Sequence, residues 1–228
     1  MGQRLNCSIK IASISEVPKT SHLKREVRLF SNSMDALFAK WEPIINAHKF
    51  SPMTEIEMRL GRRASSGFDT NVGKDTFAKV LRALQKYQGW EDAKHSNTTI
   101  YYFPGNKRLS VNEETDEQVG QIKKRVAVDD IELGSEPFDI RLGVSTEIPF
   151  EYDGEETSTQ QKTKERWSFV RKNLSIDMSI VKGNPDDKDV DDDTTYQIEL
   201  EIVDPSQVKT RDELFNILHK IFDLLKCV

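Results

Sequence analysis

Two short segments near opposite ends of the chain place glutamate at positions i and i+2: Glu55-Ile-Glu57 and Glu199-Leu-Glu201. Side chains on a β-strand alternate between two faces, so each glutamate pair shares one face and aliphatic residues occupy the other. One such strand alone is typical of a solvated face. Two of them, in a chain whose other strands carry basic residues at the same parity, predict a polar interior that holds a divalent cation and a polyanion.

Length and charge limit the alternatives. The 228 residues suffice for one domain with a sizeable core, and we expect a flexible, polar N-terminal segment over 1–33 and a single catalytic domain over 34–228. A net charge of −5 argues against broad, nonspecific coating of nucleic acid but allows a local basic pocket. Cys7 and Cys227 are the only cysteines, so neither a disulfide framework nor a zinc cluster is expected. The chain has no apolar run of 18 residues, so we expect no membrane partner.

The order of periodic segments predicts the fold class. Helical spacing of apolar residues predicts helices over 34–47, from Asp75 to a point before Gly89, and over 210–226. We expect the Asp75 carboxylate to cap the second of these helices. Eight strands are predicted over 53–60, 97–103, 107–112, 117–130, 137–149, 163–171, 173–182 and 194–203. Consecutive antiparallel strands with polar loops favour an α+β fold, a closed or nearly closed eight-stranded antiparallel barrel with helices packed outside. We interpret the aspartate-rich loop 183–193 as a solvated hairpin and not as a calcium site.

Strand parity collects charged residues on one inner surface. Its predicted members are Glu55, Glu57, Arg59, Arg108, Lys123, Arg125, Asp139, Arg141, Glu147, Lys164, Arg166, Asp177, Ser179, Glu199 and Glu201. The neighbours that are out of phase with them are mainly aliphatic. The predicted barrel is therefore charged inside and apolar outside, and the helices cover the apolar exterior.

The chemistry of such an interior points to phosphate transfer. Buried charges are costly unless they pair or coordinate a ligand, and clustered carboxylates need a cation to neutralise them. Ligation by oxygen alone selects a hard ion, Mg²⁺ or Mn²⁺. Arginine and lysine donors match phosphate oxygens. Carboxylates with a hard metal on one wall and cations on the others predict a phosphoryl-transfer site.

Six segments carry a resemblance in a fixed order: Glu55–Gly61, Ile122–Val126, Phe138–Pro149, Lys164–Arg166, Ile176–Ser179 and Gln197–Glu201. Together they resemble the strands of the metal-dependent RNA triphosphatases of fungi, protozoa and large DNA viruses. These are mRNA-capping enzymes of the triphosphate tunnel metalloenzyme superfamily. The resemblance covers about residues 53–204, and it implies a polynucleotide 5′-triphosphatase that converts the 5′-triphosphate end of RNA to a diphosphate and that also hydrolyses nucleoside triphosphates with Mn²⁺.

The resemblance also implies roles for single residues. Glu55, Glu57 and Glu201 are the implied metal ligands, and Glu147 and Glu199 orient the nucleophilic water or bind metal-held water. The implied triphosphate-binding residues are Arg108, Lys123, Lys164 and Arg166, assisted by Arg59 and Arg141. Arg125 points inward beside Lys123 and is counted with them. Asp177 and Ser179 fix the basic side chains.

The sequence departs from the family at Ser175, Gln197 and Leu60, where the family commonly has an arginine, a glutamate and an aromatic residue. The first change removes one phosphate contact unless another residue, such as Arg171, supplies it, and the second removes one carboxylate. Two other readings stay open: a tunnel-fold hydrolase of inorganic tripolyphosphate or another small triphosphate, and a noncatalytic binding module. An RNA guanylyltransferase as partner, and a nuclear location or a viral factory, follow from the capping assignment alone.

Overall fold

The computed structural model describes residues 21–65, 67–134, 136–183 and 194–228, with side chains from residue 34 onward. The first half holds helix α1 (Ser21–His48), strands β1 (Thr54–Ala64) and β2 (Gly67–Asp69), helix α2 (Lys74–Lys86), strand β3 (Asp92–Phe103), the 3₁₀ turn η1 (Pro104–Asn106) and strand β4 (Lys107–Asn112). The second half holds strands β5 (Gln118–Ile131), β6 (Asp139–Pro149), β7 (Gln160–Arg171), β8 (Leu174–Lys182) and β9 (Thr194–Ile202), the 3₁₀ turn η2 (Pro205–Gln207) and helix α3 (Arg211–Leu225).

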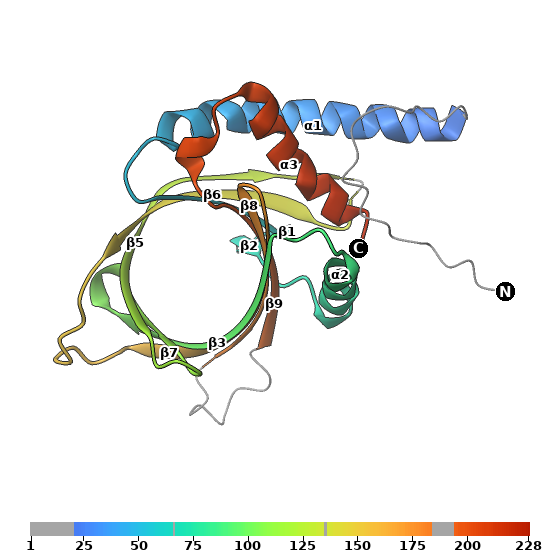
Figure 1. Cartoon of the computed structure of the whole chain (residues 1–228). Helices are drawn as coiled ribbons and strands as arrows, with labels where there is room; N and C mark the ends of the chain where they lie inside the picture. The colour runs from blue at the N-terminus through green and yellow to red at the C-terminus, as the bar shows by residue number, and fades with distance from the viewer. Residues whose placement is uncertain (1–20, 66, 135, 184–193) are drawn as a thin grey trace.

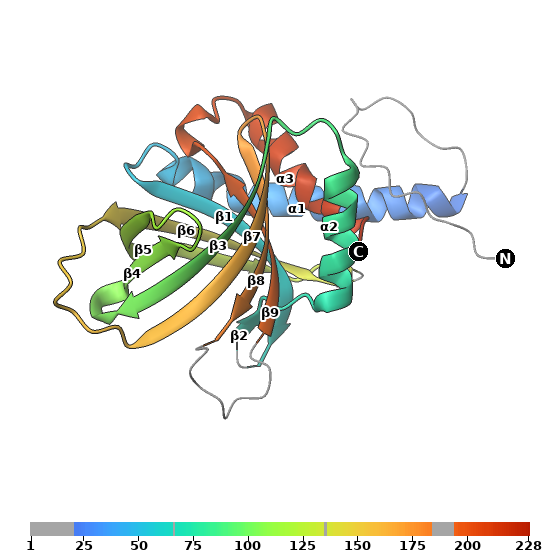
Figure 2. The same cartoon turned by 60° about the horizontal axis from the view of Figure 1, so that its bottom comes forward.

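The strands close into an antiparallel barrel. Their order is β1-β6-β5-β4-β3-β7-β8-β9, and β9 returns to pair with β1, while the short β2 extends the sheet beside β1. Figure 1 looks along the barrel, and Figure 2 shows the same strands from the side. The predicted fold class, an eight-stranded closed barrel with helices outside, is confirmed.

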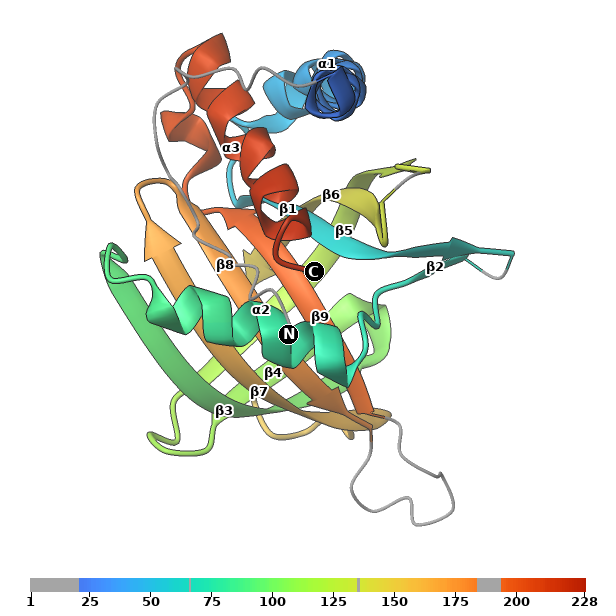
Figure 3. The same ribbon diagram turned by 90° about the vertical axis from the view of Figure 1, so that its right-hand side faces the viewer.

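The core lies on the outer face of this barrel. Ile56, Met58 and Leu60 of β1 are fully buried, as are the register partners of Met58 on the neighbouring strands, Leu142 and Leu200. Helices α1 and α3 cover this flank, and α2 lies against the side of β9 (Figure 3). An apolar outer face needs such cover, because burying apolar surface contributes about 25 cal/mol per Å².

Several boundaries differ from the predicted ones. Helix α1 begins at Ser21 and not at Met34, so the polar stretch before Met34 is partly helical. The capping prediction for Asp75 was wrong: Gly73 occupies the N-cap position of α2, without a side-chain cap, and Asp75 lies in the first turn. Residues 1–20 and the aspartate-rich loop 184–193 lie outside the described residues, so the flexible segment and the solvated hairpin stay predictions. None of the described helices combines the length and apolar character needed to cross a bilayer.

Replacing Met58 with alanine should lower the free energy of unfolding by about 2–5 kcal/mol, because the fully buried side chain leaves a cavity between sheet and helices. Urea unfolding of the purified protein measures this. Val126→Ala is the matched control: Val126 is 45% exposed, and its truncation should change stability by less than about 0.5 kcal/mol. Equal effects of the two substitutions would contradict a core outside the barrel.

Candidate polyphosphate site inside the barrel

The closure between β1 and β9 brings the two glutamate pairs together. Glu57 lies opposite Glu201 in the register of these strands, and Arg59 lies opposite Glu199. Glu55 is two residues before Glu57 on the same face. Segments about 140 residues apart in the sequence therefore form one continuous wall.

Glu199 is the anionic centre of three cations. Its Oε1 atom lies 2.9 Å from Nε of Arg59, and its Oε2 atom lies 3.5 Å from Nη2 of Arg166 and 3.7 Å from Nζ of Lys164. The side chain is only 6% exposed. Burial alone would raise the pKa of Glu199, but Lys164, Arg59 and Arg166 hold that pKa well below its usual range. Glu199 therefore stays ionised.

Lys164 has the opposite balance. Burial lowers the pKa of the Lys164 ammonium to about 8, although Glu199 pulls it upward, and the nearby Arg166 and Arg59 lower it further. An anion that approaches such a lysine raises the pKa of the ammonium again, because it favours the charged form. A phosphate group bound here would therefore stabilise the positive charge on Lys164.

A second network joins β4, β5 and β6. Arg108 pairs with Glu147 and donates to Oε1 of Gln121 from Nε and Nη2, at 3.2 and 2.9 Å. Gln121 in turn donates from Nε2 to Oε2 of Glu147 at 2.7 Å. Lys123 pairs with Glu55 and also lies 3.4 Å from Glu147. Gln121 is therefore held at both ends of its amide and fixes Arg108 and Glu147 relative to each other.

Asp177 and Ser179 lie where they orient Arg166. Oδ2 of Asp177 is 3.2 Å from Nη1 of Arg166, and Nε of Arg166 donates to Oγ of Ser179 at 3.4 Å. Asp177 also accepts from Oγ of Ser175 at 2.8 Å. Because Ser175 and Asp177 are buried, these contacts are shielded from water.

Arg141 and Arg125 lie apart from these networks. Arg141 donates two hydrogen bonds to Asp130, at 2.7 and 2.9 Å, and its guanidinium stacks 4.6 Å from the ring centre of Phe68. Arg125 is exposed, and it lies beside a register shift in β5 between Arg125 and Ala127. Their assignment to triphosphate binding stays a prediction.

Gly143 leaves the room that Glu57 fills. A Cβ atom at position 143 would lie 3.2 Å from Oε1 of Glu57 and 3.3 Å from its Cγ, because the two residues are register partners. Ser145, one step along the same strand face, donates to Oε2 of Glu55 at 2.6 Å. The parity that predicted Glu147 also points to Gly143, Ser145 and Gln121. Sequence reasoning missed all three, because on β5 and β6 it selected charged residues alone.

The carboxylates fit a hard cation by chemistry but are not arranged around one. Within the described ranges, no three acidic, histidine or cysteine side chains have the geometry of metal ligands. Lys123 lies against Glu55, and Arg59 donates to Glu57 at 2.8 Å. Burial raises the pKa of Glu57 against the pull of Arg59, with Glu199 and Glu55 adding to the rise.

Glu201 shows the excess of negative charge on this wall most clearly. Burial, with the charges of Glu55 and Asp177, raises the pKa of Glu201 to about 7. Such crowding is what an oxygen-coordinated divalent ion relieves. The donor set therefore fits Mg²⁺ or Mn²⁺.

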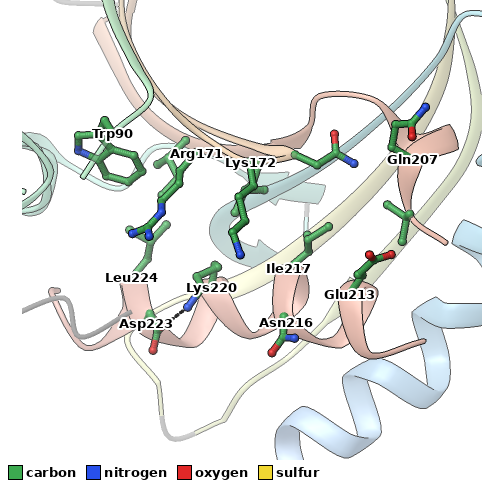
Figure 4. Close-up of a pocket in the computed structure, with 14 residues that line it drawn as sticks. Trp90, Arg171, Lys172, Gln207, Glu213, Asn216, Ile217, Lys220, Asp223 and Leu224 are labelled. Carbon is green, nitrogen blue, oxygen red and sulfur yellow. Dashed lines mark hydrogen bonds and ion pairs between the residues drawn. The ribbon is translucent and has the colours of Figure 1, made fainter. Parts of the chain in front are cut away.

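A cavity of about 490 Å³ lies outside the barrel, between α3 and the β7–β8 turn (Figure 4). Trp90, Leu174 and Ile217 line its apolar part. The charges on its α3 side are already paired, with Lys220 2.7 Å from Asp223. Of the residues suggested for phosphate binding it holds Arg171 alone, whose guanidinium lies 5.5 Å from the ring centre of Tyr87 outside the barrel, so Arg171 does not replace the arginine absent at Ser175. We therefore place the candidate site on the inner face of the barrel.

A closed antiparallel barrel with paired carboxylates and cations on its inner face is the arrangement expected of a tunnel-type phosphohydrolase. The family described as mRNA capping enzyme, beta chain, matches residues 85–225, more than half of the chain. The chain therefore belongs to this family of RNA 5′-triphosphatases. The matched range runs from the end of α2 to the end of α3 and leaves β1 outside.

Solved structures share the fold. The Pct1 RNA triphosphatase of S. pombe, solved in complex with the Spt5 CTD, has a TM-score of 0.67 and 18% identity, covering 82% of this chain and 92% of its own. Pct1 alone gives 0.65 and 15%, over 94% and 97%. The Mimivirus capping enzyme triphosphatase gives 0.58 and 15%, over 84% and 97%. No curated protein sequence matches the chain.

Replacing Gln121 with leucine should lower kcat/KM for a triphosphate substrate about tenfold or more, because Arg108 and Glu147 each lose a hydrogen bond made to a charged group. Steady-state kinetics measures this. Gln118→Leu is the control, since Gln118 is exposed at the start of the same strand. If both variants kept wild-type kinetics, Gln121 would have no positioning role.

Loss of the proton from Lys164 should weaken the binding of anions to the site at alkaline pH. The ammonium is charged below its pKa of about 8 and neutral above it, so metal-free binding of inorganic tripolyphosphate should weaken between pH 7 and pH 10. Lys164→Arg should keep its charge over this range and flatten the profile. Calorimetric titration of both proteins at several pH values measures the difference. Parallel profiles would rule Lys164 out as the titrating group.

Proposed function

We propose that this chain hydrolyses the γ-phosphate of 5′-triphosphate RNA, leaving a 5′-diphosphate end, as the first step of mRNA capping. We infer that the same site hydrolyses nucleoside triphosphates when Mn²⁺ is supplied. The observation that carries the proposal is Glu199, a buried carboxylate ringed by Arg59, Lys164 and Arg166 inside a closed barrel. This arrangement places cations for a polyphosphate beside carboxylates for a hard ion.

On the basic side, Arg108, Lys123, Lys164 and Arg166 would bind the triphosphate. Each of them now pairs with a carboxylate on the inner face, and phosphate oxygens are acceptors of the same kind. Asp177 and Ser179 would keep the Arg166 guanidinium aimed across the tunnel. Arg59, held between Glu57 and Glu199, and the more distant Arg125 and Arg141 would assist.

On the acidic side, Glu55, Glu57 and Glu201 would hold Mg²⁺ or Mn²⁺, which when bound neutralises charge on the γ-phosphoryl group. Glu147 and Glu199 would orient a water molecule for in-line attack on the γ-phosphorus. Glu147 suits this role because Arg108, Gln121 and Lys123 fix both of its oxygens. The bond between the γ-phosphorus and the oxygen that joins it to the β-phosphorus breaks. The products are inorganic phosphate and an RNA that ends in a 5′-diphosphate.

The product suggests the partner. A 5′-diphosphate end is the substrate of an RNA guanylyltransferase, so we propose such an enzyme as a partner and the nucleus, or a viral factory, as the location. The related Pct1 was solved with the Spt5 CTD, a different kind of ligand from the RNA end. A tunnel hydrolase of inorganic tripolyphosphate is separated from the proposed enzyme by comparing turnover of triphosphate-ended RNA, ATP and tripolyphosphate.

Replacing Glu57 with glutamine should reduce phosphate release from 5′-triphosphate RNA on the order of a hundredfold, because the wall loses one of its three metal-facing carboxylates. Release of γ-labelled phosphate with Mn²⁺ and with Mg²⁺ measures the rate, and chromatography of the RNA identifies a 5′-diphosphate end. Glu117→Gln, at an exposed position, is the control. Near-normal release by the Glu57 variant would overturn the proposed function.

A further inference from the structure

The connection between α1 and β1 exposes two large apolar side chains. Phe50 is 64% exposed and Met53 is 55% exposed, in a chain that otherwise buries most of its large apolar residues. Met53 also has a φ of 57°, a left-handed conformation that is strained for a residue other than glycine. Exposed apolar surface of this kind marks an interaction site when its neighbours are charged.

Two lysines flank the Phe50 ring. Nζ of Lys49 lies 5.1 Å from the ring centre, and Nζ of Lys209, which precedes α3, lies 5.6 Å from it. Backbone carbonyls hold both ammonium groups: Lys49 donates to Val208 at 2.8 Å and Lys209 donates to Ser206 at 2.6 Å. Among the salt bridges of the described residues neither ammonium takes part, although Lys209 helps to lower the pKa of the nearby Asp204 and Glu213. Phe50, Lys49 and Lys209 together are called the rim platform below.

The rim platform lies next to the end of the tunnel that carries Glu147. The backbone N–H of Glu147 donates to the carbonyl of Met53 at 2.9 Å, and β1 then begins at Thr54, one residue before Glu55. An extended chain rises about 3.3 Å per residue, so Phe50 is at most about 17 Å from Glu55. That distance is within reach of the first nucleotides of a chain whose triphosphate end lies inside the barrel.

We propose that the rim platform binds the first nucleosides of the RNA substrate, with a base stacked on Phe50 and backbone phosphates beside Lys49 and Lys209. This inference rests on the proposed function. A triphosphate occupies the inner face, so the nucleosides attached to it must lie at a mouth of the tunnel. An exposed aromatic ring flanked by two ammonium groups that form no salt bridge has the composition of a site for single-stranded RNA, because any base can stack on the ring and the cations track the backbone.

The decisive comparison is RNA against a substrate without nucleosides. Phe50→Ala should raise the KM for a ten-nucleotide 5′-triphosphate RNA about tenfold and leave kcat/KM for inorganic tripolyphosphate within about twofold. Phe50→Trp keeps an aromatic face and should keep the wild-type KM for RNA. Equal losses in the two variants would contradict stacking.

The lysines should act through salt dependence. In metal-free fluorescence anisotropy with the same RNA, Lys49→Gln combined with Lys209→Gln should reduce the slope of log K against log salt concentration by about 1.4, since each phosphate contact to a single strand contributes about 0.7. Lys79→Gln combined with Lys86→Gln, two exposed positions on α2, should leave the slope unchanged. Identical slopes for the two double variants would remove the phosphate contacts from the proposal.

The outcomes for the rim platform and for the proposed function are separable. An unchanged KM for RNA in Phe50→Ala, with wild-type turnover of RNA intact, would overturn the rim platform alone. Wild-type protein without RNA turnover would overturn the proposed function instead. If Phe50→Ala left RNA kinetics unchanged but altered the sedimentation of the protein, the exposed surface would be a protein contact, and the RNA assignment would be wrong.

Discussion

Ion pairing inside a closed sheet is the constraint on which the rest of this structure depends. Moving a single charged group out of water costs several kcal/mol after relaxation, and only a well-placed counter-charge offsets that cost. The 6% exposed Glu199 is tolerable because Arg59, Lys164 and Arg166 surround it, and Glu55 because Lys123 and Ser145 contact it. Such pairs seldom stabilise a fold more than apolar residues would. Removing one partner, however, costs about 3–5 kcal/mol, so the pairs select this arrangement without driving folding.

The driving force must therefore come from the other face of the same strands. Alternation gives β1 a charged inner face and an outer face whose Ile56, Met58 and Leu60 are completely buried. This outer surface would be in water without α1 and α3, whose Leu37, Trp41 and Leu218 are equally buried. The helices are thus a condition for the polar tunnel, because the barrel has its interior chemistry and its core on opposite sides of one sheet.

Parity explains how much of the site could be predicted from the sequence. It identified the inner glutamates and the cations of β4, β5 and β7, because the period of two is a local property of a strand. It could not assign partners, since the register between strands depends on contacts far apart in the sequence. The register shift between Arg125 and Ala127 shows the limit of this reasoning. Beyond the shift, Val128 and Asp130 take the inner positions opposite Gly143 and Arg141. Strict alternation from Lys123 would instead place the residues before Val128 and Asp130 on the inner face. The first half of α1 was missed although Leu23, Val27 and Phe30 follow helical spacing, because the charged and polar residues around them were interpreted as an irregular segment.

The pairing also bears on how the tunnel accepts a ligand. Lys123 now satisfies Glu55, and Arg108 satisfies Glu147, so a polyanion that takes either cation leaves a half-buried carboxylate without its counter-charge. The carboxylate would then regain a neutral environment only by binding a cation or a proton. Burial and the charges of Glu55 and Asp177 already raise the pKa of Glu201 to about 7. The strands that carry these glutamates are therefore where an added negative charge most needs a cation or a proton. Because both changes act on the same pairs, an anion and a cation bound together disturb the interior less than either bound alone. The same charges that make this interior costly to bury are therefore the reason why we expect it to bind a polyphosphate and a hard cation together.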